Sequence, residues 1–207
     1  MKMIEMNDQA LAARVAAVAA RVGIRGSLPL VRVVSATEMA TVSPDPARPS
    51  GVQIRACGEL WWNDVFPVTD SPVVHELSHW LVATSPSAPW PSFPHYDCDQ
   101  YGHGPLFSAL AWALAARAEA GIDDREYDLG RSGSGDRPAD RMEERWARRW
   151  ARRPHEGTAE ALAVRAIRDY RRLCQLRAMV AAVMPFLRLA VALAAAMAAT
   201  AALAHMI

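Results

Sequence analysis

Apolar residues recur at helical spacing near the start of the chain, and charged residues lie off that stripe. The pattern predicts an amphipathic helix that begins at Asn7 or Asp8, ends near Val22 and packs on a core. Arg14 and Arg21 interrupt the unbroken apolar run that a secretory signal requires, so we do not interpret this segment as an export signal. The apolar stripe consists of Leu11, Val15, Val18 and Val22.

A change to β-branched and alternating residues follows the first helix. Residues 30–34, Leu-Val-Arg-Val-Val, predict a strand. Residues 52–57 alternate and predict a second strand, and residues 59–62 predict a third that pairs with it through a turn near Gly58. The prolines of residues 40–51 predict a loop between the first two strands.

The next apolar segment contains His75-Glu76-Leu77-Ser78-His79, an H-E-x-x-H motif. Ser71 as N-cap and Pro72 at the first helical position predict the start of a helix that runs to about Thr84. Core positions at helical spacing support this helix. They are Val73, Val74, Leu77, Trp80 and Leu81.

On a helix, His75 and His79 lie one turn apart on the same face, so both imidazoles can reach one metal ion. Glu76 lies beside the first of them, where it can take a proton from a metal-bound water. A Zn²⁺ ion lowers the pKa of such a water from about 15.7 to about 7. The motif alone is also compatible with a solvated helix that carries two unrelated histidines.

A catalytic zinc needs a third protein ligand. Ser85 stands where the metzincin pattern requires a histidine, so that class is excluded. His103 is the best candidate, because flanking glycines let the backbone approach a metal and a helix from Leu106 to about Ala120 follows it. The candidates are His95, Asp97, Asp99, His103 and Glu119.

The motif and the later segment Gly102-His103-Gly104-Pro105-Leu106-Phe107 together resemble the SprT-like zinc metallopeptidases. That family includes proteases that degrade DNA–protein crosslinks. The resemblance covers about a fifth of the chain, near residues 70–112. It implies that His75, His79 and His103 bind one Zn²⁺ and that Glu76 is the general base. The chain has no C-x-x-C, so it has no zinc ribbon of the kind that some members carry.

The order of elements predicts an α+β fold with a minimal zincin-like catalytic domain. Its parts are an N-terminal helix, a small antiparallel sheet, the H-E-x-x-H helix and a third-ligand helix, with a C-terminal helical extension. In zincins a peptide substrate adds as a strand to the sheet edge beside the metal. Trp61 and Trp62 are therefore candidates for lining the cleft, although filling the core or its rim is the favoured alternative for each.

Residues 85–101 contain four prolines and predict a long loop between the ligand segments. Its position indicates a rim or lid over the metal. Tyr96 and Tyr101 are candidates for stabilising the transition state or orienting a ligand. The alternative is that both are ordinary loop residues.

The chain after the third-ligand helix has a different character. We predict residues 1–121 as the catalytic domain, residues 122–140 as a linker and residues 141–207 as a helical extension that is first arginine-rich and then alanine-rich. Trp146 and Trp150 lie one turn apart among arginines. Residues Arg141–Arg177 could bind nucleic-acid phosphates, but tryptophans docked on the core with solvated arginines are the favoured interpretation.

The last segment, residues 178–207, is apolar but rich in alanine, and Pro185 and Arg188 interrupt it. A membrane-spanning helix needs about 20 apolar residues, so a tail anchor is the lesser alternative to a buried or self-associating helix. Arginines before the segment fit a cytoplasmic flank.

Charge and cysteine content add two constraints. Residues 1–140 carry 11 basic and 17 acidic side chains, net −6, whereas residues 141–207 carry 12 and 5, net +7. The C-terminal part could therefore face an anionic partner. Three separated cysteines provide no disulfide framework, which indicates a cytoplasmic protein.

The sequence as a whole predicts a cytoplasmic zinc metallopeptidase that acts on a protein or peptide substrate, with membrane association only if the tail inserts. The alternative is a non-catalytic protein in which zinc stabilises a small domain and the arginine-rich helices bind a partner.

Overall fold

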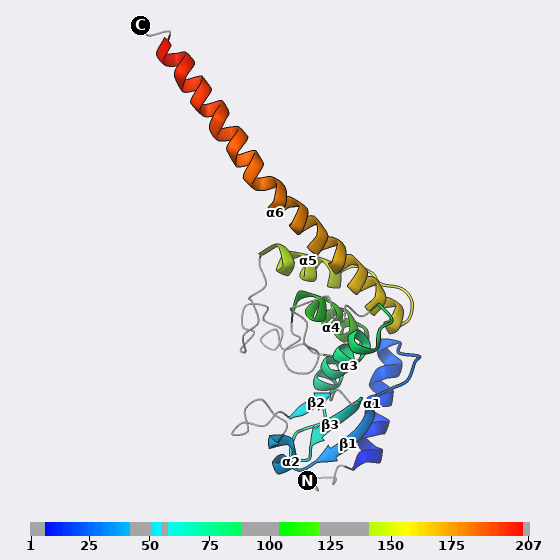
Figure 1. Ribbon diagram of the computed structural model, residues 1–207. Coiled ribbons are helices and arrows are strands. Elements are labelled where there is room, and N and C mark those ends of the chain that lie inside the picture. Colours follow the sequence, from blue (N-terminus) through cyan, green and yellow to red (C-terminus); the bar gives the residue numbers. More distant parts are fainter. Residues whose placement is uncertain (1–6, 42–50, 55–57, 88–103, 121–140, 205–207) are drawn as a thin grey trace. The chain divides into compact units, whose positions relative to one another are not determined.

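The computed structural model describes residues 7–41, 51–54, 58–87, 104–120 and 141–204. The chain forms two compact units, residues 1–168 and residues 169–207. The described part of the first unit holds a three-stranded sheet and several helices (Figure 1). The second unit is the later part of one long helix. The predicted α+β class is confirmed, and the zincin-like character stays a prediction.

Helix α1 (Asp8–Val22) confirms the predicted amphipathic helix. The side chain of Asn7 accepts a hydrogen bond from the backbone N–H of Ala10 (2.9 Å), which caps the helix. Gly23 ends it in the left-handed region, at φ 85°, where glycine carries no Cβ penalty. The predicted stripe is buried together with Ala19.

The sheet contains β1 (Leu30–Val34), β2 (Val52–Ile54) and β3 (Glu59–Asn63) in the order β1-β3-β2. Strand β2 pairs antiparallel with β3, as predicted, but β1 pairs parallel with β3. The prediction of an antiparallel sheet was therefore wrong for β1. The chain between β1 and β3 is long enough for the crossover that a parallel pair requires.

A short helix, α2 (Ala36–Ala40), follows β1 and was not predicted. Ser35 caps it by accepting a hydrogen bond from the backbone N–H of Glu38, and Glu38 reaches back to the backbone N–H of Ser35. This reciprocal pair is a capping box. The spacing Ser35-x-x-Glu38 was the sequence signal that could have located the helix.

Two helices cross the unit beyond the sheet, α3 (Asp70–Thr84) and α4 (Pro105–Ala118). Figure 1 shows α3 between the sheet and α4. Helix α3 carries the H-E-x-x-H motif but begins earlier than predicted, because Thr69 occupies the N-cap position and Ser71 lies inside the first turn. Helix α4 is buried along most of its length, with Pro105 at its first position as predicted.

Asp70 joins the motif helix to α1 by ion pairs with Arg14 and Arg21. The two arginines are seven residues apart, so they lie on the same face of α1. Burial raises the pKa of Asp70, but the hydrogen bond from Arg21 and the charges of Arg14 and Arg21 lower it more, and its pKa falls below the ordinary value of 3.8.

Replacing Asp70 with asparagine should lower the free energy of unfolding by about 1 kcal/mol at neutral pH, a value limited by the half-exposed arginines. The stabilisation by Asp70 is present above its ordinary pKa and is lost as the pH falls through the lowered pKa of the folded state. The two proteins should therefore unfold alike in urea at about pH 2. Exposed Asp64→Asn is the control, and an equal loss in that variant at neutral pH would refute the role of the ion pairs.

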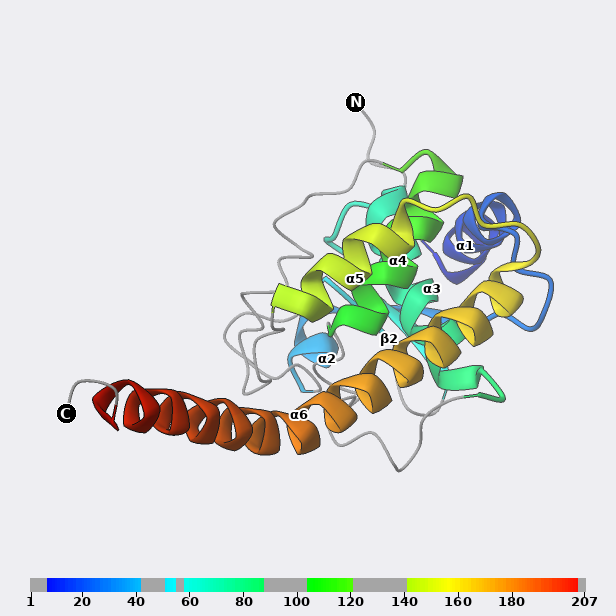
Figure 2. The same cartoon turned by 90° about the horizontal axis from the view of Figure 1, so that it is seen from above.

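Helix α5 (Arg141–Ala151) and the first turns of α6 (Ala159–Ala204) also belong to the first unit. The α5 helix packs on α4, and Trp150 is fully buried (Figure 2). Trp150 therefore has the docked arrangement favoured from the sequence, whereas Trp146 is half-buried. The predicted domain boundary near residue 121 stays a prediction.

The start of α6 is tied to the turn after α1. The carboxylate of Glu160 accepts hydrogen bonds from the backbone N–H groups of Arg25 (2.7 Å) and Gly26 (2.6 Å). Burial raises the pKa of Glu160, but these N–H donors lower it more, and it falls below its ordinary value. The guanidinium of Arg117, on α4, donates hydrogen bonds to the backbone carbonyls of Val22 and His155 and so links the end of α1 to the segment before α6.

Candidate metal centre

His75 and His79 approach each other on α3 as the i, i+4 spacing predicts. Their Nε2 atoms lie 3.3 Å apart. Two nitrogens bound to one tetrahedral zinc at about 2.0–2.1 Å stand roughly 3.3–3.4 Å apart. The two imidazoles therefore already have the separation that a shared zinc ion requires.

Glu76 is buried and is held by strand β2. Its Oε2 accepts a hydrogen bond from the backbone N–H of Ile54 (2.8 Å), and its Oε1 lies 4.0 Å from Nε2 of His75. The carboxylate thus turns one oxygen toward the sheet and the other toward the imidazoles. An element distant from α3 in the sequence thus fixes the orientation of the Glu76 carboxylate.

The register of β2 explains why Ile54 is available for this bond. Asn63 donates its backbone N–H to the carbonyl of Gly51 (2.9 Å), so Gly51 and Asn63 form a hydrogen-bonded pair. Pairs alternate along an antiparallel ladder, so Val52 and Ile54 direct their N–H and C=O groups away from β3. Glu76 therefore satisfies an N–H on the side of β2 that β3 leaves open.

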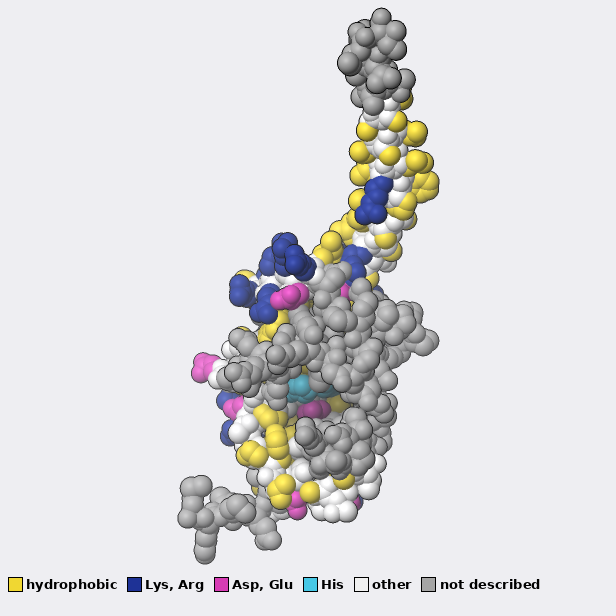
Figure 3. Space-filling view, turned by 90° about the vertical axis from the view of Figure 1, so that its left-hand side faces the viewer, with side chains coloured by type: hydrophobic (Ala, Val, Ile, Leu, Met, Phe, Trp, Pro, Cys, Tyr) yellow, Lys and Arg dark blue, Asp and Glu magenta, His cyan; other side chains and the backbone are white. Residues whose placement is uncertain are grey.

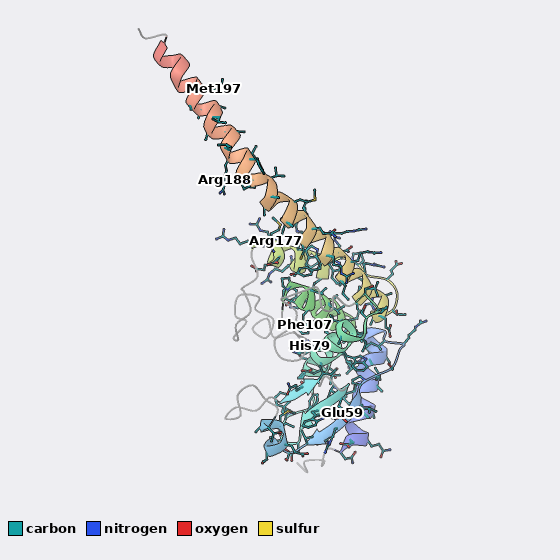
Figure 4. All side chains as sticks on the ribbon, in the orientation of Figure 1. Glu59, His79, Phe107, Arg177, Arg188 and Met197 are labelled. Carbon is teal, nitrogen blue, oxygen red and sulfur yellow. The ribbon has the colours of Figure 1, made fainter. Side chains whose placement is uncertain are left out.

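Phe107 of α4 packs against both imidazoles. Its ring stacks on His79 with centroids 4.1 Å apart and meets His75 edge-on at 4.9 Å. Phe107 is fully buried, and Figure 4 labels it beside His79 on the neighbouring helix. Contact with a buried ring restricts rotation of both imidazoles, so the core positions their nitrogens.

The centre is close to the surface of the first unit. Figure 3 shows a histidine surface next to an acidic surface on one face of the molecule. The side chains of His75 and Glu76 are 14% and 9% exposed. Both side chains are therefore mostly buried and keep only a small exposed surface.

Three of the predicted site residues, His103, Tyr96 and Tyr101, lie outside the described residues. Gly104, the next residue in the sequence after His103, is the N-cap of α4. Within the described ranges, no three or more His, Cys, Asp or Glu side chains group closely enough to hold a metal ion. The third ligand therefore stays a prediction.

The two candidate cleft tryptophans lie on opposite faces of β3. Trp62 is fully buried, and its indole N–H donates to the carbonyl of Phe66 (2.9 Å). Trp61 is half-buried and donates to the carboxylate of Glu59 (2.7 Å), with the guanidinium of Arg32 over its ring. Trp62 thus fills the core in this structure, whereas part of Trp61 faces solvent.

Sequence reasoning did not identify two groups that shape this centre. The backbone N–H of Ile54 carries no side-chain signal, and only the register of the sheet reveals it. The contact of Phe107 with the imidazoles was also not predicted, because it joins two helices and no local spacing indicates it.

Comparison of the chain with models of known protein families, with curated proteins and with solved structures finds no match.

Proposed function

We propose that this protein is a zinc-dependent peptidase of the SprT-like kind, in which His75, His79 and His103 bind one zinc ion and Glu76 is the general base. The observation that carries the proposal is the 3.3 Å separation of the two Nε2 atoms, with the Glu76 carboxylate beside them. The resemblance of the Gly-His-Gly-Pro-x-Phe segment to that family supplies the third ligand. The buried and restrained state of Glu76 further supports a catalytic role.

The donor set suits zinc, because imidazole nitrogens at tetrahedral spacing are ligands that zinc prefers. A zinc ion bound here would supply Lewis acidity and lower the pKa of a bound water. Zinc sites that catalyse hydrolysis have three protein ligands and one open position. The proposal therefore requires His103 at the centre and excludes a fourth protein ligand.

Each residue has a distinct task in the proposed reaction. The Oε1 atom of Glu76 accepts a proton from the attacking water and later delivers it to the leaving amine. The N–H of Ile54 holds the other oxygen, so the carboxylate keeps one orientation during both transfers. Phe107 keeps the two imidazole rings in a fixed orientation relative to each other and excludes water from their buried side.

A protein or peptide in extended conformation is the proposed substrate. Strand β2 adjoins Glu76, and Val52 directs its backbone groups away from β3, where a substrate strand can pair with them. The N–H of Ile54 is already bonded to Glu76, so a substrate would pair around that position.

Casein hydrolysis by the full chain tests the proposal. Activity should disappear with a zinc chelator and return when zinc is restored, because the metal is required for the reaction. His79→Gln should remove both zinc and activity, since an amide is a poor substitute for an imidazole ligand. His155→Gln is the matched control, because His155 packs on Trp150 away from α3.

Two results would contradict the proposal. Hydrolysis that persists in His79→Gln would show that another group catalyses it. Zinc bound in a 1:1 ratio without any hydrolysis of casein or of unstructured peptides would favour the alternative, a binding or assembly protein that zinc merely stabilises.

A further inference from the structure

The later part of α6 exposes apolar side chains along its described length. Every side chain from Ala178 to Met197 is exposed, and Arg188 is the only charged residue among them. Figure 3 shows this hydrophobic surface, and Figure 4 labels Arg177, Arg188 and Met197 along the helix. The large apolar members are Met179, Val180, Val183, Met184, Phe186, Leu187, Leu189, Val191, Leu193 and Met197.

These side chains are distributed around the helix rather than along one stripe. At about 100° per residue they span an arc of about 220°, and the remaining side carries alanines, Pro185 and Arg188. A helix that docks on a protein surface needs an apolar stripe only slightly wider than 100°, whereas a helix that is apolar on most sides is surrounded by core or by lipid. The distribution therefore favours a medium that touches every side of the helix.

The length of the segment matches a membrane. Residues 178–204 are helical throughout, including Pro185, and rise about 40 Å, which exceeds a hydrocarbon layer of about 30 Å and allows the helix to tilt. The helix is long and apolar enough to cross a bilayer, and its most apolar window is fully exposed. That exposure distinguishes it from the buried core helix of a soluble protein.

Charge indicates which end lies at the lipid headgroups. Arg171, Arg172 and Arg177 precede the apolar residues, and Asp169 is the last acidic residue of the sequence. Arginines in this position attract the anionic headgroups of a cytoplasmic leaflet. Arg188 lies about 16 Å beyond Arg177, which is close to the middle of a hydrocarbon layer of about 30 Å, where a single charged side chain weakens insertion. The uncharged residues 189–204 then lead from the middle of the layer toward the opposite headgroups.

We propose that residues 178–204 are a membrane-spanning anchor that places residues 1–168 on the cytoplasmic side, with residues 171–177 at the headgroups. The proposal does not rest on the peptidase activity proposed above. It assigns the exposed helix to a lipid bilayer rather than to a second copy of the chain.

Expression of the full chain in bacteria, followed by membrane fractionation, tests the anchor. The protein should sediment with membranes and resist both about 1 M salt, which screens surface charge, and alkaline carbonate. Leu193→Arg adds a second charge within the hydrocarbon layer and should lower the ratio of inserted to soluble protein by roughly tenfold to a hundredfold. Leu176→Arg is the matched control, because Leu176 is equally exposed but lies beside Arg177; it should stay in the membrane.

Each other outcome overturns the proposal. Release of the wild-type protein by salt would show binding by the arginines alone. A soluble oligomer that Leu193→Arg dissociates would assign the helix to self-association. Equal behaviour of the two variants would show that depth in a membrane does not distinguish positions 176 and 193.

Cysteine labelling tests the orientation. All three cysteines, Cys57, Cys98 and Cys174, precede the proposed anchor. A thiol reagent that does not cross membranes should label the protein only after the cells are opened. Labelling in intact cells would place residues 1–168 outside the cell and overturn the assigned side.

Discussion

Replacing Glu76 with glutamine should lower kcat for peptide hydrolysis by about 10²–10⁴ and leave zinc bound. The amide keeps the shape of the side chain but cannot accept the proton of the attacking water. The amide oxygen of the variant can still accept the hydrogen bond from the N–H of Ile54, so the fold should be preserved. Initial rates on casein and the zinc content of each protein provide the measurement.

Glu156→Gln is the control for this experiment, because Glu156 is exposed and lies in the turn before α6. It carries the same change of charge and should keep full activity. A fully active Glu76→Gln protein would show that another group removes the proton. Loss of zinc from that variant would instead show that the carboxylate supports the ligands, and it would contradict the expected retention of zinc.

Replacing Phe107 with alanine should weaken both the fold and zinc binding. Removal of a fully buried phenylalanine costs about 3–5 kcal/mol of unfolding free energy. The change also removes the ring that restricts His75 and His79, so the imidazoles lose order and zinc affinity should fall about tenfold or more. Urea unfolding without zinc and competition with a zinc chelator measure the two effects separately.

Leu110→Ala separates packing from positioning. Leu110 is also fully buried on α4, and its truncation should cost about 2–5 kcal/mol. It should alter zinc affinity much less than Phe107→Ala does. Phe107→Leu keeps most of the apolar volume and should fold, but it loses the aromatic contacts. Equal zinc affinity in Phe107→Leu and wild type would reduce Phe107 to an ordinary core residue.

Local sequence was sufficient to locate most helices and strands. The stripe of α1, the β-branched run of β1 and the capping signals at Asn7 and Pro105 each act within a few residues, so they can be recognised without the fold. The parallel pairing of β1 could not be obtained in this way. Strand direction depends on how the connecting chain returns to the sheet, and apolar alternation is the same for both directions.

The boundary of the first unit also depends on distant contacts. The composition of residues 121–140 predicts a linker, which lies outside the described residues, and residues 141–168 belong to the first unit. Trp150 is buried against this unit, and Glu160 bonds the turn after α1. Polar composition reports the exposure of a segment, whereas it carries no information on whether the elements on either side pack together.

The sequence alone determined that His75 and His79 share one helical face with Glu76 beside them, because helical geometry converts the spacing directly into proximity. It also identified an apolar C-terminal segment behind an arginine-rich flank. Only the tertiary structure decided that the open side of β2 holds the Glu76 carboxylate, that Phe107 packs on both imidazoles, and that apolar side chains are exposed around the later part of α6. These features depend on how elements far apart in the chain are arranged in space. The spacing of residues along the sequence gives no information on such distances.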